Sequence, residues 1–215
     1  MTRSPLGFLA GILFLSAFGA LTATAQSIGI GGGLAVPNDK IAQVTAQLAQ
    51  QGLHGGAEAA QNGYYVELRG RFGKALALTG GIGYNHFAPA NSGYFDGSDR
   101  SVQLQSSQTM IPVSVGVDMR LGQGIITPYL SLEATYNLYT RSFDPVQGES
   151  TPGVTLESST DSRFGAAVGG GVNFDLSPID IAVGARLHVA NLLNQENGEA
   201  EIYYLQLGAT LYLHL

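Results

Sequence analysis

Apolar residues alternate with polar or small residues along eight stretches of this chain. A period of two residues places successive side chains on opposite faces of an extended strand, so each stretch is predicted to be a β-strand. Each is roughly long enough to cross a bilayer as a tilted strand, and an even number of such strands is typical of membrane barrels. The predicted strands cover about 27–36, 63–73, 75–87, 108–121, 125–140, 163–175, 179–191 and 201–215.

The connections between these strands are predicted to alternate in length. Antiparallel neighbours send successive connections to opposite ends of a barrel, so one end should carry only tight turns and the other all the large loops. That asymmetry is typical of barrels in the bacterial outer membrane. Long connections are expected at 37–62, 88–107 and 141–162, a medium one at 192–200, and tight turns at 73–74, 122–124 and 176–178.

Within each strand the two faces differ in chemistry. In 110–121 one face is apolar at the alternate positions from Ile111 to Leu121, whereas the other carries Asp118 and Arg120. The stretches 64–72 and 179–189 are divided in the same way. A soluble barrel would turn its apolar face inward and its charges to water. A barrel in a bilayer does the reverse, because a charge that faces hydrocarbon costs far more than one inside the barrel.

Composition separates these two alternatives. Hydrophobic residues make up 45% of the chain and charged residues only 12%, about half of the roughly 25% that is usual in soluble proteins. A soluble β-sandwich or barrel would need a more charged outer surface than this chain can supply. The sequence therefore favours an all-β fold, an eight-stranded antiparallel up-and-down transmembrane β-barrel. Residues 201–215 should pair with 27–36 to close it, because an open edge is not tolerated in hydrocarbon.

The first 25 residues are interpreted as a cleaved signal peptide. Arg3 is followed by an apolar stretch from Leu6 to Leu21 and then by Ala23-Thr24-Ala25, which has the small-x-small form of a signal-peptidase site. The alternative, a membrane-spanning helix, is disfavoured because the stretch is short and lacks a basic stop. The barrel domain is then expected at 26–215, in the outer membrane of a Gram-negative-type envelope.

Charge and cysteine content narrow the range of partners. Removal of residues 1–25 takes away one basic residue, so nine basic residues remain against 16 acidic ones, a formal net charge of −7. Nucleic acid is therefore not an expected partner, because binding to phosphates requires basic surfaces. The chain has no Cys, which excludes a lipoprotein, disulfides and a thiolate metal site.

The inward face is predicted to hold a network of paired charges. An eight-stranded barrel is just wide enough for its own side chains, so the simplest interpretation is a core plugged by ion pairs. Many other inward positions are glycines, which leaves a second interpretation open: a narrow channel or small-ligand cavity beside the arginines. The predicted interior polar network consists of Glu67, Arg69, Arg71, Asp118, Arg120, Glu133, Asp175, Asp180, Arg186 and His188.

At this point the chain resembles a known family. The alternating strands and turns, and "MIPVSVGVDMRLGQGIITPYLSLEATY" as two strands around a Gly turn, look like the small eight-stranded barrels of the outer-membrane-protein beta-barrel domain family. The resemblance covers 26–215 and rests on pattern more than on a diagnostic motif. It implies an insertion signal in the last strand, read by the barrel-assembly machinery. Members commonly end on an aromatic residue, and this chain departs from them with Leu215. The residues that match the signal are Gln206, Gly208, Leu211 and Leu213.

A search for catalytic or metal chemistry gives no candidate. The histidines at 54, 86, 188 and 214 form no i, i+2 or i, i+4 pair that could offer a metal two ligands. One lipid A deacylase type among these barrels carries His-x-Ser on a strand, whereas here His188 is followed by Val189 and Ala190, without the nucleophile. The sequence therefore predicts no enzyme activity, no cofactor and no metal site.

Two features of the long connections bear on function. Ile41, Val44 and Leu48 lie at helical spacing within 39–53, which predicts a short helix that caps the barrel mouth, lies on the membrane or meets a partner. Most of the remaining acidic residues, Asp161 among them, are expected in these connections. The predicted role is structural: envelope integrity or adhesion-like surface contact, with lipid, lipopolysaccharide and a surface ligand as partners of a monomer. The alternative is the narrow channel.

Overall fold

The computed structural model describes residues 26–38, 61–95, 101–145, 159–193 and 201–215. They form eight β-strands, and in this part of the chain no helix is long and apolar enough to cross a membrane. The predicted signal peptide at 1–25 and the predicted helix within 39–53 lie outside the described residues. The strands are β1 (Gln26–Pro37), β2 (Gln61–Gly73), β3 (Leu76–Phe95), β4 (Ser101–Arg120), β5 (Ile126–Pro145), β6 (Ser159–Asp175), β7 (Ile179–Leu193) and β8 (Tyr203–His214).

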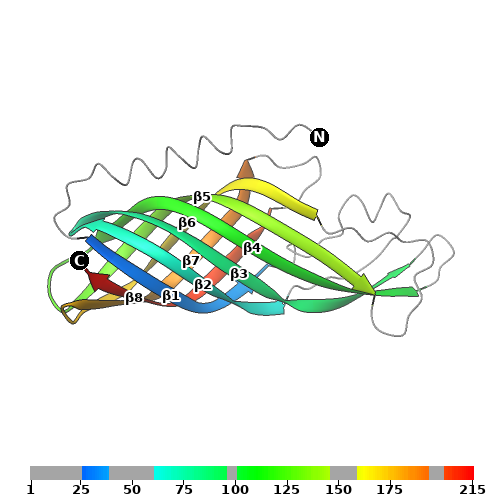
Figure 1. The fold of residues 1–215 in the computed structure, drawn as a ribbon, viewed down its shortest axis with the longest axis horizontal. Coiled ribbons are helices and arrows are strands. Elements are labelled where there is room, and N and C mark those ends of the chain that lie inside the picture. The colour runs from blue at the N-terminus through cyan, green and yellow to red at the C-terminus, as the bar shows by residue number, and fades with distance from the viewer. Residues whose placement is uncertain (1–25, 39–60, 96–100, 146–158, 194–200) are drawn as a thin grey trace.

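The strands close into one antiparallel barrel in sequence order, as Figure 1 shows. Each strand pairs with its neighbour in the chain, and β1 also pairs with β8, with Ile28 opposite Leu213 and Leu34 opposite Leu207. The predicted fold class and the predicted closure of the last strand on the first are therefore confirmed. Closure pairs the backbone groups of every strand, which is the condition for a β-structure to exist in hydrocarbon.

The two faces of the sheet have the polarity expected in a bilayer. Large apolar side chains on the outer face are exposed, such as Ile30 at 66% and Leu132 at 60%, whereas inward charged side chains are buried. Exposed aromatic side chains lie toward the loop ends of the strands and meet in pairs. Tyr136 and Phe164 have ring centroids 5.1 Å apart, and Tyr64 and Tyr84 have centroids 6.4 Å apart. Aromatic belts of this kind occur at the membrane interface.

The two ends of the barrel differ. The turn end carries the connections 74–75, 121–125 and 176–178 together with the start of β1 and the end of β8. Gly73, Gly122 and Gly124 have positive φ angles there, which the tight turns require and other residues rarely adopt. The loop end carries the other four connections.

One predicted connection is wrong. Most of the expected loop at 88–107 is strand, because β3 and β4 continue as a paired hairpin with Ala90 opposite Ser106 and Phe95 opposite Ser101. The connection is only 96–100, as short as the turn at 121–125, so long and short connections do not strictly alternate. The expected loop at 141–162 is likewise shortened, since β5 reaches Pro145 and β6 begins at Ser159.

The reason for this error is physical. A hairpin that extends past the bilayer continues the pairing of the strands in the barrel, and its side chains face water, so it does not need an apolar lipid-facing side. Its sequence then lacks the alternation by which the membrane-spanning part was recognised. In Figure 1 the extended β3, β4 and β5 project beyond the other strands at the loop end.

Candidate functional site: the barrel interior

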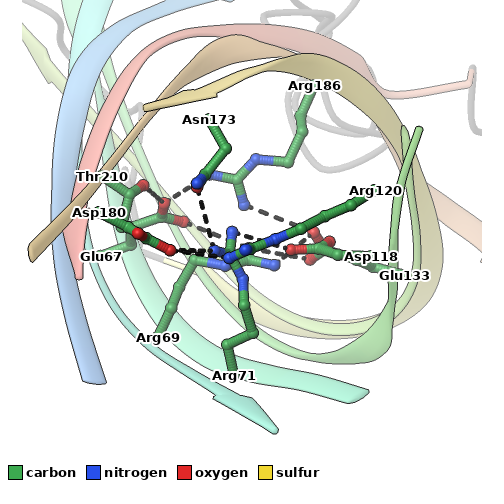
Figure 2. Close-up of polar contacts among 10 residues, drawn as sticks. All are labelled: Glu67, Arg69, Arg71, Asp118, Arg120, Glu133, Asn173, Asp180, Arg186 and Thr210. Atoms are coloured by element: carbon green, nitrogen blue, oxygen red, sulfur yellow. Dashed lines mark hydrogen bonds and ion pairs between the residues drawn. The ribbon is translucent and has the colours of Figure 1, made fainter. Parts of the chain in front are cut away.

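The inward side chains of β2, β5 and β7 meet in the middle of the barrel as paired charges. Arg69 donates two hydrogen bonds to the Glu133 carboxylate, at 2.8 and 3.3 Å. Arg186 donates to Glu67 at 2.5 Å and also lies 3.6 Å from Glu133. Thr210 on β8 completes the group with a hydrogen bond to Glu67 at 2.9 Å. Figure 2 shows these side chains converging from different strands toward the barrel axis.

A second set of charges lies closer to the turn end. Arg71 is 3.3 Å from Asp118, 3.6 Å from Asp180 and 3.2 Å from the Asn173 side-chain oxygen. Arg120 donates to Asp180 at 2.7 Å. These contacts join β2, β4, β6 and β7 across the lumen, and Figure 2 includes them with the first set.

The charges of the two sets balance. Four arginines face four carboxylates, Glu67, Asp118, Glu133 and Asp180, and all four carboxylates are buried. The Arg71 guanidinium also lies 4.0 Å from the centroid of the Tyr212 ring, a cation–π contact. Removing one member of such a network would leave an uncompensated buried charge, which is strongly destabilising.

Inward glycines make room for the large side chains of this network. A Cβ atom on Gly29 would lie 2.6 Å from Cδ1 of Tyr212, and one on Gly184 would lie 2.6 Å from the Tyr129 hydroxyl. Non-bonded atoms do not approach this closely, so a larger residue at either position would have to displace its neighbours. The space beside these inward glycines is thus filled by side chains of the network, and it does not form an open passage.

A layer of neutral polar groups lies on the loop side of the charges. His188 Nε2 donates to Gln206 Oε1 at 2.9 Å, and Gln206 Nε2 donates to Asn85 Oδ1 at 2.7 Å. The His188 ring is stacked on Tyr204, with centroids 4.5 Å apart. Gln206, which was assigned by resemblance to the insertion signal, is therefore also a hydrogen-bonding member of the core. Asn85 was not predicted as a site residue, because a single inward amide in a strand carries no distinctive pattern.

An apolar layer follows toward the loop end. Its side chains are at most 4% exposed, and Phe87 packs edge-on against Tyr204 with ring centroids 5.6 Å apart. Burial of this much aromatic and aliphatic surface stabilises the barrel. The layer consists of Ala35, Tyr65, Phe87, Met110, Tyr139, Ala190, Ile202 and Tyr204.

Two cavities between these layers are small. One of about 20 Å³ is lined by charged side chains that include Arg71, Asp118 and Glu133. Another of about 10 Å³ lies beside Gly83, Pro112 and His188. Volumes of this size hold about one water molecule.

The remaining predicted site residues lie outside the ion-pair network. Asp175, at the end of β6, accepts a hydrogen bond from the Ser177 backbone at 3.2 Å. Leu211 and Leu213 are exposed on the outer face, as is usual for lipid-facing residues, and Gly208 packs opposite Gly33 across the β1–β8 seam.

Three ligand-type side chains meet at the turn end. Asp175, Asp180 and His214 come from three different strands, and their ligand atoms lie within 4.8 Å of one another. The spacing of histidines along the chain predicted no metal site, and it could not detect a group that only the folding of β6, β7 and β8 brings together.

The closed barrel, its apolar outer face and its ion-paired interior define an outer-membrane β-barrel protein. The sequence matches the family described as outer membrane protein beta-barrel domain over residues 10–211, and the chain belongs to that family. No curated protein sequence matches it.

Two solved structures share the fold. Neisserial surface protein A is 13% identical, with a TM-score of 0.56 over 87% of this chain and 96% of that chain. A major outer membrane protein from Thermus thermophilus is 11% identical, with a TM-score of 0.53 over 89% of this chain and 98% of that chain. At these identities the likeness concerns the fold alone.

Proposed function

We propose that this outer-membrane barrel is non-conducting and has a structural or interactive role. It would support envelope integrity or adhesion-like surface contact through the segments at its loop end. The observation that carries this proposal is the filled interior: a charged layer, a polar layer and an apolar layer follow one another along the axis. A hydrated ion would have to pass all three, and in the apolar layer only tyrosine hydroxyls could replace the water that the ion loses.

The alternative, a narrow channel or ligand carrier, has less support. It would use the glycine-lined space beside Arg69, Arg71, Arg120 and Arg186, but the two cavities described above among these side chains measure only about 20 and 10 Å³. The arginines already bind carboxylates of the same network. A substrate anion would have to compete with these buried carboxylates.

The partners in this proposal follow from the two surfaces. The apolar outer face would contact outer-membrane lipid and lipopolysaccharide, and the last strand would be read by the barrel-assembly machinery before the monomer closes. The loop end would meet an unidentified surface ligand. The acidic residues at the loop end are only partly available to such a ligand, since Asp161 already binds Arg141 at 3.1 Å.

Complementation of a deletion strain tests the surface role. The strain would receive either the wild-type protein or a variant in which 40–58 and 147–157 are replaced by short Gly-Ser linkers. We expect both proteins to fold in the outer membrane, because every strand that the structure describes is left unchanged. Only the wild type should restore wild-type resistance to detergent and attachment of whole cells to a solid surface. Full restoration of both traits by the shortened variant would contradict the proposed role of these segments.

A further inference from the structure

Asp175, Asp180 and His214 form a compact group at the turn end, away from the loop end to which the function is assigned. Asp175 and Asp180 face each other in the β6–β7 register. The His214 backbone nitrogen donates to the Pro178 carbonyl at 3.0 Å, which holds the end of β8 against the β6–β7 turn. The three side chains offer one imidazole nitrogen and two carboxylate oxygens within 4.8 Å of one another.

A second observation points to a ligand for this group. The Asp180 side chain is completely buried, and its Oδ2 atom is bound by Arg120 at 2.7 Å. Its other oxygen, Oδ1, lies 3.0 Å from His214 Nε2, and the two form an ion pair when the imidazole is protonated. Within the described residues, neither atom has a hydrogen bond of good geometry. A buried polar atom without a hydrogen bond is costly. The two atoms lie close enough together to bind one small cation.

We propose that this group binds a divalent transition-metal cation, with Zn²⁺ as the best match. Zinc accepts imidazole nitrogen and carboxylate oxygen together at about 2.0–2.2 Å, so two ligand atoms on one tetrahedral ion lie roughly 3.3 Å apart. The 3.0 Å separation of the Asp180 and His214 atoms is close to this spacing. Rotation of the Asp175 side chain, which ends its strand, would bring in the third ligand, and water would be the fourth.

The surroundings suit an exchangeable site. The His214 side chain is 34% exposed, so an ion can enter from the turn end, which faces the periplasm in outer-membrane barrels. Arg120 binds the Asp180 oxygen that points away from His214. A hydrogen bond to the carboxylate oxygen that does not bind the metal fixes the orientation of the carboxylate.

Binding of the ion would fix the last strand, β8, to the β6–β7 hairpin beside it. His214 lies on β8 opposite Ser27 of β1, at the seam between the last and first strands. The two aspartates lie on the β6–β7 hairpin, so one ion would tie this hairpin to the closing strand. An ion that binds only the folded barrel raises the stability of that state.

Zinc titration of the purified barrel in detergent micelles tests this proposal. The wild type would first be treated with a chelator and then titrated with ZnCl₂. Calorimetry would measure zinc binding, and the shift in the melting temperature of the barrel would measure its effect on stability. We expect His214→Gln and Asp175→Asn to weaken the tightest site by about tenfold or more. His86→Gln is the matched control and should bind zinc like the wild type, because His86 lies beside Tyr64 near the loop end.

Cobalt distinguishes this site from acidic groups elsewhere in the chain. Co²⁺ bound through a histidine in a tetrahedral site gives a visible absorption band, which should appear in the wild type and in His86→Gln but be lost in His214→Gln. If His214→Gln fails to fold by gel mobility, Asp175→Asn, which leaves the closing strand intact, decides the question in its place. Equal zinc affinity in the wild type and the variants, or no stabilisation of the wild type by zinc, would overturn the proposal.

Discussion

Replacement of Glu133 by alanine is expected to lower the free energy of unfolding of the barrel by about 3–5 kcal/mol. Glu133 accepts both hydrogen bonds from Arg69 and lies 3.6 Å from Arg186, and it is 2% exposed. Its removal would leave two buried guanidinium groups short of a partner in a region of low dielectric. Urea unfolding in lipid vesicles, followed by circular dichroism, would measure the loss.

Two further variants identify the cause of this effect. Glu201→Ala is the matched control, because Glu201 is exposed and its replacement should change stability by less than about 0.5 kcal/mol. The double variant Glu133→Ala, Arg69→Leu removes both members of the pair and should recover part of the loss. A Glu133→Ala barrel as stable as the Glu201→Ala barrel would contradict the assignment of the charged layer as the stabilising core.

A valine at Gly171 should prevent most of the chain from reaching the folded form. A Cβ atom at this position would lie 2.6 Å from the Gly184 Cα atom and closer still to the Val183 carbonyl oxygen. Both contacts are with the backbone of β7, which is fixed by its pairing with β6 and β8, so relief by rotation of a side chain is not available. Overpacking usually costs about 1–3 kcal/mol, and we expect a larger loss here because backbone must move.

The folded fraction can be measured from gel mobility before and after boiling. Ala185→Val is the control, since Ala185 lies next to Gly184 on the same strand but on the outer face, where the two added methyl groups meet lipid. This variant should fold like the wild type. Comparable folded fractions for Gly171→Val and Ala185→Val would show that β6 and β7 do not approach as closely as described.

The membrane-spanning part of the fold could be predicted from the sequence because one physical constraint acts on every residue in it. Side chains must alternate between lipid and lumen, so Ile111 and Asp118 reveal their faces by position alone. The same constraint identified the charged inward residues. It does not act beyond the bilayer, which is why the paired hairpin at 88–95 and 101–107 was mistaken for a loop.

Contacts between strands were harder to predict. Arg69 and Arg186 were both expected to face inward, but their shared partner Glu133 depends on the tilt and register of strands distant in sequence. Asn85 and His214 were not identified from the sequence, because their contacts are with residues on other strands. The alternation of residues along one strand shows whether a side chain faces lipid or the lumen. Its partner in the lumen depends on how the strands are arranged in the closed barrel.

The ion permeability of the folded protein tests the central claim, that three successive layers seal the lumen. Purified barrel would be reconstituted into planar lipid bilayers, with an open porin treated in the same way as the positive control. We predict that the wild type leaves the bilayer without stepwise conductance while the porin conducts. Discrete conductance steps from the wild type, with an ion selectivity that changes in Arg186→Glu, would contradict the sealed interior.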